Sequence, residues 1–257
     1  MSKLLERALT VECDGLQLDG GAWIPPEPRA TVVLLHGMPS QMPPAPGSVD
    51  YPGLARRWAE RGWAAMWADM RSVRGSQGFF SIEGWVRDAL AWLGAAQALS
   101  PGKPLAVIAT SAGGPVAAEA IRRGGPADAL VLLAAPAGWE GFADDAHDGA
   151  RRVLFGSGLA LGPGVLQDPT IWAAEFDGVT TERSIEEVGI PTLVVHGTAD
   201  TVVPVSHAHR IAAHARRAEL AILEGAEHNL RHDPVVMDQV ARWLEQALGL
   251  AAAAEAS

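Results

Sequence analysis

A serine at the end of an apolar run is the residue of this chain best placed for chemistry. Ser111 follows the run Leu105–Thr110 and precedes Ala112, Gly113 and Gly114. This pattern predicts a strand that turns sharply into a helix and pushes the serine side chain out above the sheet edge, because only small neighbours let the two backbones pass so closely. The N–H of Ala112, at the start of that helix, would point to where an oxyanion forms. Ser111 is therefore a candidate nucleophile.

Two further candidates each follow an apolar strand later in the chain. Asp200 lies in the loop after the run 190–197, and His228 lies in the loop after the run 221–223. In a parallel sheet the carboxyl ends of the strands share one edge, so residues far apart in sequence can converge there. A serine hydroxyl needs a base to become a good nucleophile, and the base needs an acceptor that fixes its tautomer. We expect His228 to be the base and Asp200 to be the acceptor.

From about Leu16 to about Leu248 the chain resembles the α/β-hydrolase family. Ser111, Asp200 and His228 match the triad of this family. The segment Leu34–Pro39 resembles its oxyanion loop, which implies that the N–H of Met38 joins that of Ala112 as an oxyanion donor. One motif departs from the family pattern. Where the family has G-x-S-x-G this chain reads Ala109-Thr110-Ser111-Ala112-Gly113, so we expect a slightly shifted turn with the nucleophile retained.

The order of the predicted elements indicates an α/β fold of the α/β-hydrolase type. Strands and helices alternate, which is typical of a mostly parallel sheet, here of eight strands, with helices on both faces. The alternation stops between Pro136 and Ile190, where isolated large apolar residues and glycines predict a short lid above the carboxyl edge of the sheet. We divide the chain into the first half of the core (1–136), the lid or cap insertion (137–189), the second half of the core (190–248) and a disordered tail (249–257).

Composition narrows the function classes further. With 257 residues, 48% of them hydrophobic, the chain can bury one large core. A net charge of −10 argues against a nucleic-acid partner, which needs clustered Lys and Arg. Basic residues come in short pairs such as Arg122–Arg123, which we expect on solvated helix surfaces. No apolar run approaches the roughly 18 residues of a membrane span, and the first residues lack a secretory signal, which favours a cytoplasmic protein.

Several other residues near the predicted edge could contact a substrate or support the site. We expect substrate contacts from His36, Trp139, Phe142 and Trp172, with ordinary packing as the alternative for each. Asp69, Arg71 and Arg74 are expected to form an internal salt bridge that supports their loop. The single Cys13 cannot form an internal disulfide. We expect neither a metal nor a cofactor.

The leading functional hypothesis is a serine hydrolase that cleaves carboxylic esters or thioesters with small to medium apolar acyl groups through an acyl-enzyme. An aminopeptidase-like amide hydrolase is an alternative, with Glu140, Asp144 or Glu175 as the acid that would bind the substrate's amino group. An acyltransferase on the same triad is another alternative. A non-catalytic alternative is a ligand-binding member of the fold that has no turnover. The expected partner is a small molecule; the oligomeric state stays open, with a homodimer as one option.

Overall fold

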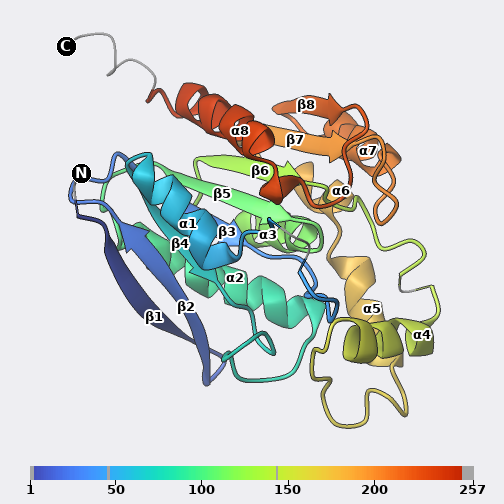
Figure 1. Cartoon of the computed structure of the whole chain (residues 1–257). Coiled ribbons are helices and arrows are strands. Elements are labelled where there is room, and N and C mark those ends of the chain that lie inside the picture. Colours follow the sequence, from blue (N-terminus) through green and yellow to red (C-terminus); the bar gives the residue numbers. More distant parts are fainter. Residues whose placement is uncertain (1–2, 45–46, 143, 251–257) are drawn as a thin grey trace.

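A computed structural model describes residues 3–44, 47–142 and 144–250, and it contains one eight-stranded sheet (Figure 1). The strands are β1 (Leu5–Cys13), β2 (Leu16–Ile24), β3 (Ala30–Leu35), β4 (Trp63–Ala68), β5 (Leu105–Thr110), β6 (Ala129–Leu133), β7 (Thr192–Gly197) and β8 (Ala218–Leu223). They lie in the order β1-β2-β4-β3-β5-β6-β7-β8. The β1–β2 and β2–β4 pairs are antiparallel, and the pairs from β4 through β8 are parallel. The predicted mostly parallel sheet is confirmed.

The central strands are apolar throughout because both of their faces are covered. Every residue of β3, β4, β5 and β7 is buried, as expected for parallel strands between two helical layers. The register aligns their carboxyl ends, since Leu35 of β3 pairs with Ala68 of β4 on one side and with Ala109 of β5 on the other. The loops that follow β3 and β5 therefore start side by side.

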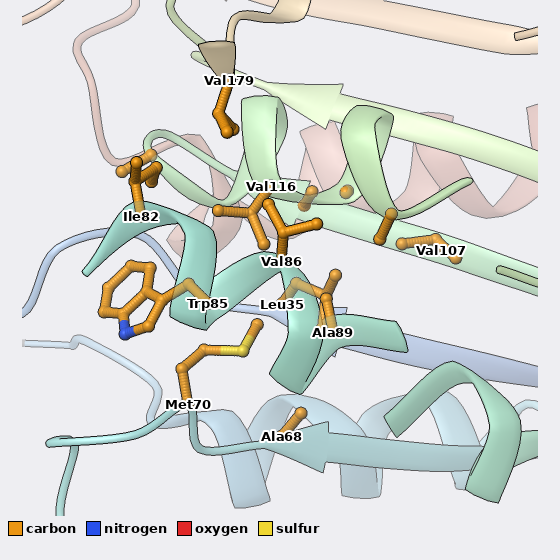
Figure 2. Close-up of a cluster of buried hydrophobic side chains, with 14 of the residues drawn as sticks. Leu35, Ala68, Met70, Ile82, Trp85, Val86, Ala89, Val107, Val116 and Val179 are labelled. Atoms are coloured by element: carbon orange, nitrogen blue, oxygen red, sulfur yellow. The ribbon is translucent and has the colours of Figure 1, made fainter. Parts of the chain in front are cut away.

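In the described part of the chain, the helices that cover the two faces of the sheet are α1 (Tyr51–Glu60), α2 (Ile82–Gln97), α3 (Gly113–Arg122), α7 (Ser206–His214) and α8 (Pro234–Ala247). Helices α1 and α8 share one buried cluster with the sheet, and α2, α3 and α7 share the other. Figure 2 shows part of this second cluster, with side chains of α2, α3 and the sheet, among them Val86, Val116 and Leu35. Helix α8 begins at Pro234, where the Asp233 side chain accepts from the N–H groups of the first turn.

The segment 137–189, which was predicted to be an insertion and is called the insertion below, contributes short helices and no strand to the sheet within its described residues. These are α4 (Ala146–Arg151), a π-helical turn (Arg152–Gly156), α5 (Thr170–Gly178) and α6 (Thr181–Ile185). Helices α4 and α5 stand beside the sheet, on the right in Figure 1. No side chain caps the start of α5. Glu175, within α5, accepts from the N–H of Glu83 at the start of α2, at 3.1 Å, and so connects the two helices. That the insertion acts as a lid over Ser111 stays a prediction.

Contacts at both ends and in the middle hold the insertion to the core. Thr181 Oγ1 donates to Pro136 O at 2.6 Å, which joins the two ends of the insertion. Ala160 N donates to Ser72 Oγ at 2.6 Å, and Phe80 N donates to Ala160 O at 2.7 Å. The loop after β4 therefore anchors the middle of the insertion.

The two arginines at the end of α3 are partly exposed and ion-paired. With 25% and 32% of their side chains exposed, Arg122 and Arg123 both donate to Glu119, whose side chain is 1% exposed. Helix α3 turns this carboxylate inward toward the insertion, where Ser184 Oγ also donates to it at 2.7 Å. The expected tail 249–257 lies, from residue 251 onward, outside the described residues. No helix in the described ranges is long and apolar enough to span a bilayer.

Candidate active site

Ser111 occupies a strained turn between β5 and α3. Its φ is +52°, a left-handed conformation that costs a non-glycine residue roughly 1–2 kcal/mol. The turn is held on both sides, since Ser111 N donates to Leu133 O and Gly114 N donates to Ser111 O, each at 2.8 Å. The methyl group of Ala109, which stands where the family motif has glycine, is fully buried in the core. The departure from the motif is therefore accommodated inside the sheet, without displacing the serine from its turn.

Three side chains from three loops form a continuous hydrogen-bonded chain. His228 Nε2 lies 3.0 Å from Ser111 Oγ, and His228 Nδ1 lies 2.8 Å from Asp200 Oδ2. Asp200 is buried, whereas 16% of the His228 side chain is exposed. The structure thus brings together Ser111, Asp200 and His228, the three candidates from the sequence. In this geometry His228 can accept the serine proton on Nε2 while Nδ1–H donates to a carboxylate that solvent does not reach.

Both oxygens of the Asp200 carboxylate have hydrogen-bond partners in the structure. The N–H groups of Val202 and Val203 both donate to Asp200 Oδ1, at 2.9 Å each. Oδ2 is left to face His228, and His196 Nε2 lies 3.3 Å from the same oxygen. A carboxylate held by two backbone donors keeps one orientation, so its second oxygen stays aimed at the imidazole.

The loop after β3 lies directly against the serine turn. A methyl group built on Gly37 would lie 2.8 Å from Ser111 Cβ and 3.3 Å from Ala112 N, so only glycine permits this approach. Met38 follows Gly37 directly in this loop. Within the described residues, neither the N–H of Met38 nor that of Ala112 donates to a protein acceptor. That these two N–H groups form an oxyanion hole stays a prediction.

His36 holds this loop in place through both ring nitrogens. Nε2 accepts from Met70 N at 3.1 Å, so the proton of the neutral ring lies on Nδ1, which donates to Gly37 O at 2.8 Å. Burial lowers the pKa of the imidazole from 6.5 to about 4, which keeps it neutral. With both nitrogens bound to backbone groups, the ring supports the loop; substrate contact by His36 stays a prediction that its burial does not favour.

The three aromatic residues proposed for substrate contact lie together in the insertion. Trp139 and Phe142 are partly buried, Trp172 is buried, and all three pack on Phe176 with ring centroids 5.0 to 5.7 Å apart. Trp139 Nε1 donates to Val179 O at 2.6 Å. Trp172 and Phe176 continue through Phe80 to Trp85, which stands edge-on to His36. These rings pack on one another, and their contact with substrate stays a prediction.

The charged residues after β4 form internal ion pairs, as proposed from the sequence. Arg74 donates to Asp69 through Nε at 2.6 Å and through Nη2. Arg71 is 6% exposed and pairs with the fully buried Asp88 and with Asp14. These pairs connect the loop to α2 and to the turn between β1 and β2. Cys13 lies beside them, and burial raises the pKa of its thiol to about 11, which leaves it unreactive.

Sequence reasoning overlooked two residues that the structure places beside the site. His196 lies 3.3 Å from Asp200 Oδ2, and its position four residues before Asp200, at a strand end, was the available signal. Ser72 has a φ of +67° and bonds Ala160, 88 residues away in the chain. A strained serine with a distant backbone partner has no local signature, so no sequence pattern could have found it.

Comparison with known proteins identifies the family. Residues 26–154 match the family model described as serine aminopeptidase, S33, and residues 170–249 match the model of a TAP-like protein, both of the α/β-hydrolase type. The chain belongs to the α/β-hydrolase family, which confirms the resemblance read from its motifs and supports a hydrolase. No match was found among curated protein sequences.

Solved structures with the same fold are distant in sequence. Est1E from Butyrivibrio proteoclasticus is 18% identical with a TM-score of 0.69, covering 95% of this chain and 99% of its own. The esterase Pf2001 from Pyrococcus furiosus is 17% identical with a TM-score of 0.66, covering 96% of this chain and 90% of its own. A meta-cleavage product hydrolase from Pseudomonas fluorescens IP01 is 17% identical with a TM-score of 0.65, covering 95% and 98%. At this identity they establish the shared fold.

Proposed function

We propose that the protein is a serine hydrolase that cleaves carboxylic esters or thioesters with small to medium apolar acyl groups through an acyl-enzyme. The observation that carries the proposal is the chain from Ser111 Oγ through His228 to Asp200, with contacts of 3.0 and 2.8 Å. The strained serine turn and the adjacent N–H groups of Met38 and Ala112 support it. An esterase among the solved structures of the same fold agrees with this proposal.

In the proposed reaction each group moves one proton or stabilises one charge. Ser111 Oγ attacks the acyl carbon while its proton passes to His228 Nε2, and Asp200 stabilises the resulting imidazolium through Nδ1–H. The oxyanion accepts from the N–H groups of Met38 and Ala112, each worth about 3 kcal/mol in the transition state. The alcohol or thiol leaves with the proton from His228. Water then attacks the acyl-serine by the same route, releases the acid and restores the serine.

The acids suggested for an aminopeptidase have other partners, which favours esters over peptides. Glu140 pairs with Arg210 at 2.8 Å, and Glu175 accepts from the N–H of Glu83. Asp144 accepts from the N–H of Gly141 at 2.9 Å. A peptidase of this kind needs a carboxylate available to the substrate's ammonium group. Since these three are engaged elsewhere, the ester hydrolase is the better-supported function, and acyl transfer remains the alternative that shares its first half-reaction.

The test is turnover of p-nitrophenyl esters from acetate to laurate, compared with that of an aminoacyl p-nitroanilide. We expect an optimum at a short or medium chain and a loss of about 10⁴-fold in kcat for Ser111→Ala. Ser206→Ala, at an exposed serine on α7, is the matched control and should keep full activity. Labelling by a serine-directed phosphonate should occur in the wild type and in Ser206→Ala, and should be lost in Ser111→Ala.

Two outcomes would redirect the assignment. Rapid cleavage of the anilide with little ester turnover would establish the peptidase instead. Phosphonate labelling that depends on Ser111, without hydrolysis of any ester, would direct the search to acyl transfer, to be followed with added alcohols or amines as acceptors. Equal turnover by Ser111→Ala and the wild type would remove the serine from the mechanism.

A further inference from the structure

A second histidine, His196, stands behind the carboxylate of the site. It is the fifth residue of β7 and is fully buried. Its Nε2 is 2.8 Å from Val203 O and 3.3 Å from Asp200 Oδ2. Val203 is also the residue whose N–H donates to Asp200 Oδ1. One imidazole nitrogen therefore contacts both the carboxylate and the turn that orients it.

The chemistry of these contacts fixes the tautomer of His196. A carbonyl oxygen only accepts, so Nε2 carries the proton and donates to Val203 O, with Asp200 Oδ2 3.3 Å from the same nitrogen. Nδ1 is the lone-pair nitrogen, and it has no partner among the described residues. Burial lowers the pKa of the ring, which agrees with a neutral imidazole. A neutral donor can hold a carboxylate without competing with His228 as its cationic partner.

We propose that His196 is a positioning residue of the hydrolase: its Nε2–H holds Asp200 and the turn through Val203, so that Oδ2 meets His228 in line. The inference rests on the proposed function, in which Asp200 acts on the substrate only through His228. Asp200 then has the N–H groups of Val202 and Val203 on Oδ1 and His228 on Oδ2, and the polar N–H of His196 lies 3.3 Å from Oδ2. Loss of the His196 donor concentrates negative charge on Oδ2 and loosens the turn.

This predicts a change in the pH dependence, because more charge on Oδ2 binds the His228 proton more tightly. The titratable groups around His196 are Asp200 and His228 on the site side and His207 on α7. His207 is itself held by the N–H of Ala137, which donates to its Nδ1 at 3.0 Å. A change in the protonation of His207 could also shift the pH profile of activity. A second measurement that does not depend on His207 is therefore needed.

The experiment compares His196→Phe, which keeps a ring of similar volume without the donor, with His196→Gln, whose side-chain amide restores a donor near the Nε2 position. We expect kcat/KM for the preferred ester to fall about tenfold in His196→Phe. The acid limb of its pH profile should move upward by at least half a pH unit. His196→Gln should recover at least half of that shift. His209→Phe, an exposed position on α7, is the matched control and should leave the profile unchanged.

Phosphonate titration of active sites separates positioning from simple loss of folded protein. If His196→Phe lowers only the fraction of labelled enzyme, and the profile of the labelled fraction superimposes on that of the wild type, the proposal is overturned. ¹⁵N NMR of the wild type needs no variant: we expect His196 protonated at Nε2 and unprotonated at Nδ1 at pH 7 and above. Protonation at Nδ1 would also overturn it.

The ring of His228 can be titrated by NMR in unliganded protein, which distinguishes failure of this inference from failure of the proposed function. If the wild type hydrolyses no ester, the proposed function fails, yet a higher His228 midpoint in His196→Phe than in His209→Phe still supports the positioning contact. If ester hydrolysis is normal and that midpoint is the same in both variants, the hydrolase assignment stands and the role of His196 is refuted.

Discussion

The buried His36, at the end of β3, holds the loop beside Ser111, and this role can be tested by measuring stability without measuring turnover. His36 binds Gly37 O and Met70 N, and it is 4% exposed. Because each nitrogen has one partner of fixed character, a second proton on the ring would break the bond to Met70. The loop beside Ser111 is therefore stable only while His36 is neutral.

We predict that the free energy of unfolding decreases as the pH falls from 7 to 5, in part because of His36. Its folded pKa is about 4, against an ordinary value of 6.5. The unfolded chain therefore binds this proton first, and the stabilisation is complete only above pH 6.5. The contribution of this one group over the window is about 2 kcal/mol. Denaturant unfolding of His36→Asn should show a flatter pH dependence than that of the wild type.

His209→Asn, at an exposed position, is the control for that measurement and should reproduce the wild-type slope. A His36→Asn variant whose unfolding free energy falls as steeply as that of the wild type would show that other groups carry the effect.

The alanine at the start of the serine motif leads to a second residue-scale prediction. Ala109 is fully buried and its methyl packs in the core behind the turn. Ala109→Gly restores the family motif, but it removes that methyl and adds backbone entropy to the unfolded chain. We expect it to lower the free energy of unfolding by about 1 kcal/mol and to change ester turnover by less than twofold.

Ala65→Gly on β4, which is equally buried, should cost a similar amount and serves as the matched control. A rise of fivefold or more in turnover for Ala109→Gly alone would show that the methyl holds the serine turn away from its productive geometry.

At the scale of elements, the sequence predicts the strands and helices whose pattern is set by residues close together in the chain. Strand β4 is an unbroken apolar run and α2 has apolar residues at a 3–4 spacing, and both patterns are set by neighbours in the chain. Ser111, Asp200 and His228 were found because each follows a strand of that kind. The insertion offered no such rule: its helices are short, and one turn is π-helical. Its anchors at Ser72 and Glu119 depend on distant partners, which spacing does not reveal.

Helix α3 joins the serine turn to the end of the insertion through Glu119. Burial alone raises the pKa of this carboxyl, but hydrogen bonds from Arg122, Ser184 and Arg123 lower it to about 2. Its stabilising contribution is therefore present above the ordinary value of 4.5 and lost as the pH falls toward 2. Arg123 also pairs with Glu83 of α2 at 2.7 Å. The three elements α2, α3 and α6 thus share one ion-pair network.

We predict that Glu119→Gln weakens this junction, because two arginines lose a buried anionic partner. The free energy of unfolding should fall by about 3 kcal/mol, and amide exchange in α6 should accelerate. Glu187→Gln, which removes an exposed partner 3.5 Å from Arg122, should change stability by less than about 0.5 kcal/mol. Equal effects of the two variants on exchange in α6 would show that burial of Glu119 is not what holds the insertion.

At the scale of the whole molecule, the sheet separates two apolar layers that share every central strand. One layer lies under α2, α3 and α7 and extends to the insertion, and the other lies under α1 and α8. Adjacent residues of β3 point into different layers: Leu34 belongs to the cluster with α1 and α8, and Leu35 to the cluster with α2 and α3. Since each strand contributes to both layers, neither layer can lose its packing while the sheet stays intact.

We therefore predict one cooperative unfolding transition that responds equally to a cavity on either side. Leu34→Ala and Leu35→Ala are a matched pair, since the two side chains are 1% and 0% exposed, and each should lower the free energy of unfolding by about 3 kcal/mol. Circular dichroism and tryptophan fluorescence should give coincident transitions in both variants. Leu35→Ala should also reduce ester turnover more than Leu34→Ala, because its cavity opens on the side of Trp85, which packs against His36. Separate transitions in either variant would mean that the two layers unfold independently, and that the sheet does not couple them.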